Sequence, residues 1–272
     1  MIKKLLVALI FCGVAAVAMA HDTWLQTNTN VVRTGDAVHV DLMLGNHGNA
    51  HRDFKLASKT KLDDCKLEVI APDGKQYDLK ESLIDNGYSP QEGFWSAKVV
   101  TSQPGLYIVA YTLDTVHHRT RGVKGAKVLF VASDSLDKVS SEIPGFDKPS
   151  GHLLELVPET NPVTPMGPGK AIKVRLLYKG KPLADTRVSF IPRGEVLSGD
   201  FDKNFERLTD NEGRATFIPK TGNYYLVVAR HIEPEQKGDG YDKTSYSAAL
   251  TVLVPELCSC CTGTEPEGTK QK

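Results

Sequence analysis

The sequence has few cysteines, and they are unevenly placed. Of the five in 272 residues, Cys12 lies near the amino terminus, Cys65 stands alone, and Cys258, Cys260 and Cys261 crowd the carboxyl end. This distribution excludes a disulfide-dense scaffold, so the fold must rest on its hydrophobic core. The three close thiols could bind a soft metal ion or form disulfides, and neither use is encoded by their spacing.

The chain also lacks net charge and familiar catalytic motifs. Lysine plus arginine equals aspartate plus glutamate, at 33 each, and no basic stripe stands out. We therefore expect neither nucleic acid nor an anionic membrane surface as a partner. The sequence contains no Gly-x-Ser-x-Gly, no phosphate-binding loop and no His-Glu-x-x-His, so we do not expect an enzyme.

One long apolar run is present, and it lies at the amino terminus. Two lysines precede the run Leu5–Val17, and Ala18-Met19-Ala20 follows with small residues at the usual cleavage positions. The run is too short for a comfortable membrane span. Residues 1–20 are therefore predicted to be a signal peptide, which makes the protein periplasmic or secreted and leaves no transmembrane segment in the mature chain. The mature chain would begin with His21.

The rest of the sequence predicts strands, and no segment has a convincing helical period. Between Ala37 and Leu44 apolar residues alternate with others, and Pro72-Asp73-Gly74 is a turn signal after another strand. Short strands with turns about every ten residues predict an all-β fold of two immunoglobulin-like β-sandwiches in tandem. The predicted parts are a first sandwich over residues 21–132, a linker over 133–151, a second sandwich over 152–256 and a flexible cysteine-containing tail over 257–272.

The second half carries a more specific pattern. The segments Gly180–Val188, Thr209–Phe217 and Gly222–Tyr224 resemble those of transthyretin-like and carboxypeptidase-regulatory-like sandwiches. In this pattern Gly213 closes a tight turn, and the apolar positions after it alternate into the core. The resemblance implies a fold and says little about function.

Eight histidines are present, and His21 has the most distinctive chemistry. An amino-terminal histidine can offer both its α-amine and its imidazole Nδ1 to one metal ion. The amine has a reference pKa near ~8, so a metal can displace its proton at neutral pH. The alternative is a solvated side chain that happens to follow the cleavage site.

Four further histidines are candidate ligands because they follow predicted strands. His47 and His51 lie in a glycine-containing loop, His118 follows a strand of the first half, and His231 ends a strand of the second half. Imidazole suits nickel, copper, cobalt and zinc. Each of these residues could equally be an ordinary polar residue of a loop or strand end.

The mature chain resembles the DUF4198 family, which includes NikM-like periplasmic components of nickel or cobalt uptake. The matching features are His21–Leu25, the strand leading to Gly45 and His47, the strand ending at His231, and the closing strand Tyr246–Val252. The resemblance implies a bound nickel or cobalt ion and a membrane metal transporter as partner. Because Asn46 separates Gly45 from His47, the loop ligand is His47 or His51.

We therefore expect a periplasmic binding protein for a divalent transition metal ion, with nickel or cobalt favoured and copper an alternative. His21, His47 or His51, and His231 would form a nitrogen-rich site. A second hypothesis is a cell-envelope interaction module that binds a protein or glycan without metal. A third is a histidine-brace copper protein, for which the sequence offers no evident flat aromatic surface.

Overall fold

The computed structural model describes residues 21–45, 47, 62–87, 89 and 92–256, and all of its regular structure beyond three short 3-10 turns is β-strand. The prediction of an all-β sandwich fold is confirmed. The predicted signal peptide, the cysteine-containing tail and His51 lie outside the described residues.

The strands form three sheets. A four-stranded sheet from the first half contains, in spatial order, β1 (Asp22–Thr27), β3 (Ala37–Gly45), β7 (Trp95–Val100) and β6 (Ile84–Asp85). A four-stranded sheet from the second half contains β10 (Leu154–Pro158), β11 (Ile172–Tyr178), β12 (Lys181–Pro182) and β15 (Arg214–Phe217). We call these the amino-terminal and carboxy-terminal small sheets.

The third sheet has nine strands and takes strands from both halves. Its order is β14 (Glu206–Leu208), β13 (Arg187–Pro192), β16 (Asn223–Glu233), β17 (Lys243–Val254), β9 (Thr120–Ser133), β8 (Gly105–His117), β4 (Cys65–Ile70) and β5 (Gln76–Asp78), and β2 (Val31–Arg33) pairs with β9. The 3-10 turns are η2 (Leu62–Asp64), η3 (Lys80–Ser82) and η4 (Leu136–Lys138). We call this the central sheet.

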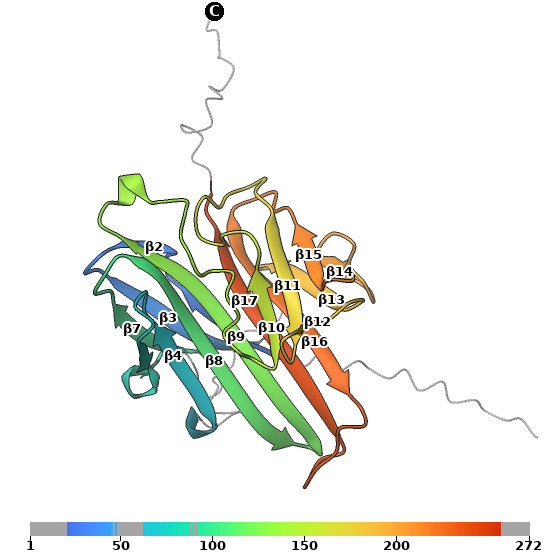
Figure 1. Cartoon of the computed structure of the whole chain (residues 1–272). Helices are drawn as coiled ribbons and strands as arrows, with labels where there is room; N and C mark the ends of the chain where they lie inside the picture. Colours follow the sequence, from blue (N-terminus) through green and yellow to red (C-terminus); the bar gives the residue numbers. More distant parts are fainter. Residues whose placement is uncertain (1–20, 46, 48–61, 88, 90–91, 257–272) are drawn as a thin grey trace, which may run out of the picture.

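The halves meet in the central sheet through a parallel ladder between β17 and β9, which runs from Lys243 opposite Thr120 to Thr251 opposite Val128. The other pairings of the central sheet are antiparallel, apart from the parallel pair of β2 and β9. In Figure 1, β8, β9, β17 and β16 run side by side, and β10 and β11 cross over them on the near side.

The two small sheets cover opposite faces of the central sheet. On β9, Val128 and Phe130 belong to a core with the amino-terminal small sheet, whereas Leu129 and Val131 belong to a core with the carboxy-terminal one. Strand side chains alternate between faces, so a strand covered on both sides must be apolar throughout. The continuous apolar runs of β8 and β9 therefore follow from their place between two cores.

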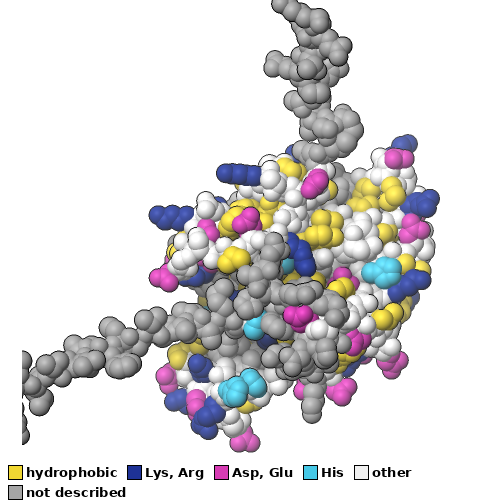
Figure 2. All heavy atoms as spheres, turned by 180° about the vertical axis from the view of Figure 1, so that it is seen from behind, with side chains coloured by type: hydrophobic (Ala, Val, Ile, Leu, Met, Phe, Trp, Pro, Cys, Tyr) yellow, Lys and Arg dark blue, Asp and Glu magenta, His cyan; other side chains and the backbone are white. Residues whose placement is uncertain are grey.

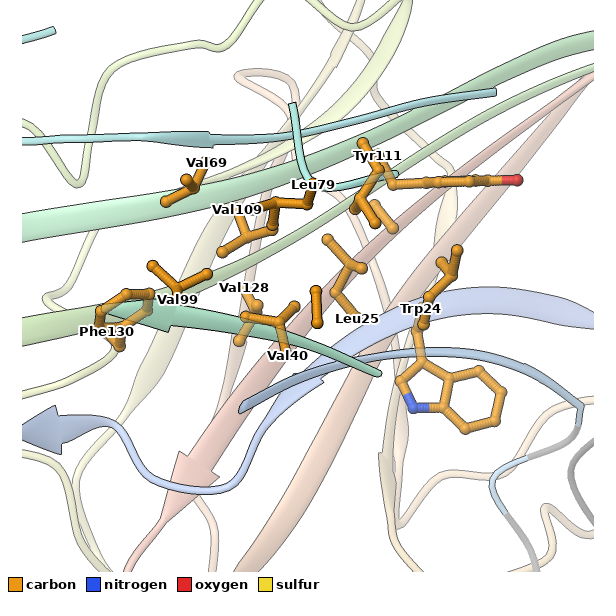
Figure 3. Close-up of a cluster of buried hydrophobic side chains, with 14 of the residues drawn as sticks. Trp24, Leu25, Val40, Val69, Leu79, Val99, Val109, Tyr111, Val128 and Phe130 are labelled. Carbon is orange, nitrogen blue, oxygen red and sulfur yellow. The ribbon is translucent and has the colours of Figure 1, made fainter. Parts of the chain in front are cut away.

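The amino-terminal small sheet shows the alternation that the sequence predicts. On β3, Val38, Val40 and Leu42 have no exposed surface and pack into the core, while His39 on the other face is exposed. Figure 3 shows this core, with Phe130 at one end and Trp24 of β1 at the other. The end of the core marked by Trp24 is where His21 and His47 lie.

Candidate metal site around His47

His21 and His47 lie at the same end of the β1–β3 pair. Asp22 is opposite Gly45 in the ladder, so His21 comes directly before the last pair and His47 two residues after it. The register therefore places these two residues, which the sequence analysis groups as candidate ligands, at one end of the pair. The antiparallel pairing of β1 with β3 thus puts His21 and His47 at the same end of the sheet, although 25 residues lie between them in the sequence.

An ion pair between the buried Asp22 carboxylate and the exposed Arg230 side chain holds the beginning of β1. The carboxylate of Asp22 is 7% exposed and accepts a hydrogen bond from Nη2 of Arg230 on β16 at 2.5 Å. Burial raises the pKa of Asp22, and the positive charges of Arg230 and Lys124 act in the opposite direction. Because β16 belongs to the central sheet, this pair fixes the residue next to His21 against the most extensive sheet of the protein.

The His47 imidazole is buried and oriented by one backbone hydrogen bond. Its side chain is 3% exposed, and Nδ1 lies 3.0 Å from the carbonyl oxygen of Ile191 on β13. A carbonyl oxygen can only accept, so Nδ1 carries the proton and Nε2 keeps its lone pair. This is the arrangement that metal-binding histidines commonly adopt, with the second ring nitrogen bonded to a backbone carbonyl.

The Nε2 atom of His47 has no hydrogen-bond partner among the described residues, although it is fully buried. The indole of Trp24 lies edge-on to the imidazole, with ring centroids 5.4 Å apart, and its Nε1 is likewise buried without a described partner. A buried polar atom without a partner costs about 1–3 kcal/mol. The two atoms belong to rings in contact, and each needs a partner that the described residues do not supply.

The electrostatics of the site keep His47 neutral. Burial lowers the pKa of His47 to about 4, and the positive charge of Arg193 acts in the same direction. The hydrogen bond to Ile191 has the opposite effect and is outweighed. A metal ion that binds Nε2 at neutral pH therefore has no proton to displace from this ring.

His231 lies on the other face of the central sheet. On β16 it shares a face with Val227 and Ala229, which belong to the core of the carboxy-terminal small sheet. Its ring packs against Tyr178 of β11 at 4.7 Å, and its Nε2 is 3.2 Å from a carboxylate oxygen of Glu233. The structure does not bring His231 to His47, and the central sheet lies between them.

His118 is also remote from His47. It occupies the exposed turn between β8 and β9 with a φ of 45°, and its ring lies 4.0 Å from that of His117. The tip of this hairpin is tied to the β16–β17 hairpin by two hydrogen bonds from Arg119 to Asp242, each 2.6 Å. Across the described residues, no group of three or more histidine, cysteine, aspartate or glutamate side chains could hold a metal ion.

Several residues of structural interest were not singled out from the sequence. Trp24 orients His47, Arg230 anchors Asp22, and His152 lines a cleft on the opposite face of the central sheet. His152 lies near the start of the second predicted sandwich, away from any predicted strand end. No motif marks His152 in the sequence; in the structure, a Cβ atom at Gly125 would be 2.7 Å from its Nδ1.

On the face drawn in Figure 2, no one kind of side chain is concentrated among the visible described residues. Figure 2 shows that cationic, anionic and apolar side chains are interspersed over the visible part of the face behind that of Figure 1. No helix of the described residues is long and apolar enough to cross a membrane.

Comparisons with known proteins give distant structural likenesses. No curated protein sequence matches the chain. Among solved structures, Salmonella alpha-2-macroglobulin reacted with methylamine is similar over 86% of this chain and 15% of its own, with 14% identity and a TM-score of 0.25. A DUF4785 family protein from Legionella pneumophila is similar over 85% of this chain and 56% of its own, with 12% identity and a TM-score of 0.27.

The adhesin FdeC of Escherichia coli is similar over 86% of this chain and 65% of its own, with 10% identity and a TM-score of 0.23. The chain therefore spans less than two thirds of each of these three proteins. At the level of sequence the match is more extensive: residues 18–233 match the model of the family described as a domain of unknown function, DUF4198, and the chain belongs to that family.

Proposed function

We propose that this protein binds a divalent transition metal ion outside the cytoplasm, with Nε2 of His47 as one ligand. The observation that carries the proposal is the state of that atom, which is buried, unprotonated and without a hydrogen-bond partner in the described chain. Cleavage after Ala20 would supply the remaining donors, because His21 would then offer its α-amine and Nδ1 at the same end of the β1–β3 pair.

The donor set favours nickel and copper over calcium or magnesium. Imidazole and amine nitrogens suit nickel, cobalt, copper and zinc, and a nitrogen-rich square arrangement suits Ni²⁺ or Cu²⁺. The indole of Trp24 cannot ligate a metal because Nε1 is only a donor. Its role would be to exclude water from one side of the imidazole and to restrict its rotation.

The DUF4198 resemblance extends the proposal to nickel or cobalt uptake. In that role the protein would be periplasmic and would deliver its ion to a membrane metal transporter. His231 would then serve something other than this site, since it lies on the opposite face of the central sheet. His51 remains a candidate loop ligand that lies outside the described residues.

The experiment uses the mature protein with a native His21 terminus, titrated with Ni²⁺, Co²⁺, Cu²⁺ and Zn²⁺ by calorimetry. His47→Asn is the sharpest variant, because the asparagine amide can still donate to Ile191 and tolerates the φ of 32° at this position. It provides no counterpart of Nε2. We expect affinity to fall by at least about 100-fold, the upper range for disturbing a metal site.

Two further proteins complete the test. One alanine added before His21 removes the amine–imidazole chelate and leaves the fold unchanged, so it should weaken binding as strongly as His47→Asn. His39→Asn removes an exposed imidazole from β3 and should bind as the wild type does. Equal affinity of the wild type and His47→Asn would refute the proposal, as would absence of binding by all four ions at micromolar concentrations.

A further inference from the structure

The turn between β8 and β9 brings two exposed imidazoles together. His117 ends β8, His118 follows it in the turn, and both residues are exposed. Adjacent residues within a strand point to opposite faces, but His118 has left the strand conformation and has a φ of 45°. Its ring lies beside that of His117, with the ring centroids 4.0 Å apart and the ring planes at 63°.

The two central residues of this turn are not those that its backbone favours. His118 and Arg119 stand between the paired residues His117 and Thr120, and their φ values are 45° and 58°. Hairpin turns with positive φ at both central residues favour Asn-Gly, because a residue with a side chain loses about 1–2 kcal/mol in the left-handed region. Asn-Gly would form the same turn with less strain, but it would not place an imidazole beside His117.

Contacts with the β16–β17 hairpin fix the position of the turn. Nε and Nη2 of Arg119 donate to the two carboxylate oxygens of Asp242, each at 2.6 Å, and the Asp242 backbone N–H donates to the Arg119 carbonyl oxygen at 2.9 Å. In Figure 1 the two hairpin tips lie side by side at the lower end of the molecule. Because the arginine and the carboxylate share two hydrogen bonds, the contact restricts orientation as well as distance. A site held in this way loses less conformational entropy when it binds a ligand.

The two imidazoles are the polar groups of this tip that remain available to a ligand. Arg119 is bound to Asp242, and Arg121 on β9 is bound to Asp114. Within the described chain, neither the His117 ring nor the His118 ring takes part in a hydrogen bond or an ion pair. Imidazole nitrogens suit copper, nickel, cobalt and zinc, whereas calcium and magnesium prefer oxygen ligands. The chemistry of the available groups therefore indicates a transition metal ion.

The spacing of the rings fits two ligands of one ion. A metal-bound imidazole nitrogen lies about 2.0–2.1 Å from the ion, so two ligands at a right angle are about 3 Å apart. Rings whose centroids are 4.0 Å apart can reach this separation of nitrogens by rotation of the exposed side chains about χ1 and χ2. Across the described residues, no third histidine, cysteine or carboxylate completes a group that could hold a metal ion. Water molecules therefore fill the remaining coordination positions.

We propose that His117 and His118 form a second, solvent-facing metal site that binds Cu²⁺ through one nitrogen of each ring. Among divalent ions of the first transition row, Cu²⁺ binds a given set of nitrogen ligands most tightly, and Ni²⁺ and Zn²⁺ bind less tightly. With only two protein ligands, the ion exchanges readily with the solvent. This site does not rest on the proposed site around His47, because the two sites share no residue.

The test uses the mature chain carrying His21→Ala and His47→Asn, so that neither of these two imidazoles is present. Cu²⁺ is added and followed by calorimetry and by NMR of the histidine ring signals, which the paramagnetic ion broadens at close range. We expect binding at micromolar Cu²⁺, with the His117 and His118 signals broadened together and before those of the other histidines.

His117→Gln and His118→Asn each remove one ligand, and asparagine tolerates the positive φ at residue 118. Each variant should weaken Cu²⁺ binding at least about tenfold, the lower range for disturbing a metal site. His39→Asn is the matched control, because it removes an exposed imidazole of β3 and should bind Cu²⁺ as its parent does. In the wild-type chain, His117→Gln should lower the number of Cu²⁺ ions bound at micromolar concentrations by one.

No binding of Cu²⁺ at micromolar concentrations, or unchanged affinity in both histidine variants of the tip, would overturn the proposal. Two independent imidazoles would behave differently from a shared site: loss of one would halve the number of bound ions and leave the affinity of the other unchanged. That result would also overturn the proposal.

Discussion

The buried histidine of the candidate metal site makes a specific prediction about stability in acid. The pKa of His47 falls from 6.5 to about 4 on folding, because burial disfavours the imidazolium. The unfolded chain therefore binds a proton at a pH where the folded chain does not. Full stability is present above pH 6.5 and is lost as the pH falls toward 4. At about 1.4 kcal/mol per pH unit, the loss from this residue is about 3 kcal/mol.

The assay is urea unfolding of the metal-free protein, followed by tryptophan fluorescence between pH 7 and 4.5 with a chelator present. Other groups also titrate in this range, so the informative quantity is the difference between the wild type and His47→Asn. The wild type should lose about 2–3 kcal/mol more than the variant as the pH falls. The variant His39→Asn measures the effect of removing a histidine from a neighbouring exposed position. If the wild type and His47→Asn lose stability in parallel, the assigned burial and protonation state of His47 are wrong.

Two further predictions concern the fold. Lys127→Met should destabilise the protein by about 3–5 kcal/mol, measured by chemical unfolding, because it leaves its buried partner, the Glu155 carboxylate at 2.6 Å, without a counter-charge. The double variant with Glu155→Leu should recover only part of this, because three backbone N–H groups lose their acceptor; full recovery would contradict the role of Glu155 as their acceptor. Gly213→Ala should lower the melting temperature more than Gly169→Ala does. Both glycines have positive φ, so both substitutions strain the backbone. A Cβ atom at residue 213 would also lie 2.6 Å from the Leu176 carbonyl oxygen, whereas one at residue 169 meets nothing within 4 Å. Equal losses of stability would show that the backbone around Leu176 shifts without cost, which would contradict this reasoning.

Local patterns were sufficient to predict the all-β sandwich class. The alternation of Val38, Val40 and Leu42 identifies one buried face of β3, and each of these residues is fully buried. The parallel ladder between β9 and β17 was not predictable in the same way. Its strands are more than a hundred residues apart, and no local signal specifies which distant edge a strand will join.

The candidate site was predictable in part, for reasons of geometry. His21 was chosen for its terminal amine and His47 for its place after a strand, and the β1–β3 register puts both at the same end of the pair. His231 was grouped with them because it ends a strand, but the two-residue period of β16 places it with Val227 and Ala229 on the other face. Trp24 contacts the His47 ring, and the backbone carbonyl of Ile191 accepts its hydrogen bond. Neither contact corresponds to a sequence motif, so neither could be predicted.

The position of β17 has a consequence for how the chain folds. This strand is near the carboxyl end of the sequence, yet it lies in the interior of the central sheet between β16 and β9. Until residues 243–254 have emerged from the ribosome, the edge of β9 that later pairs with β17 has no partner along most of its length. Contacts this distant form slowly, and an unpaired apolar edge is prone to aggregate. A chaperone that holds the nascent chain open would therefore matter until the last strand is complete.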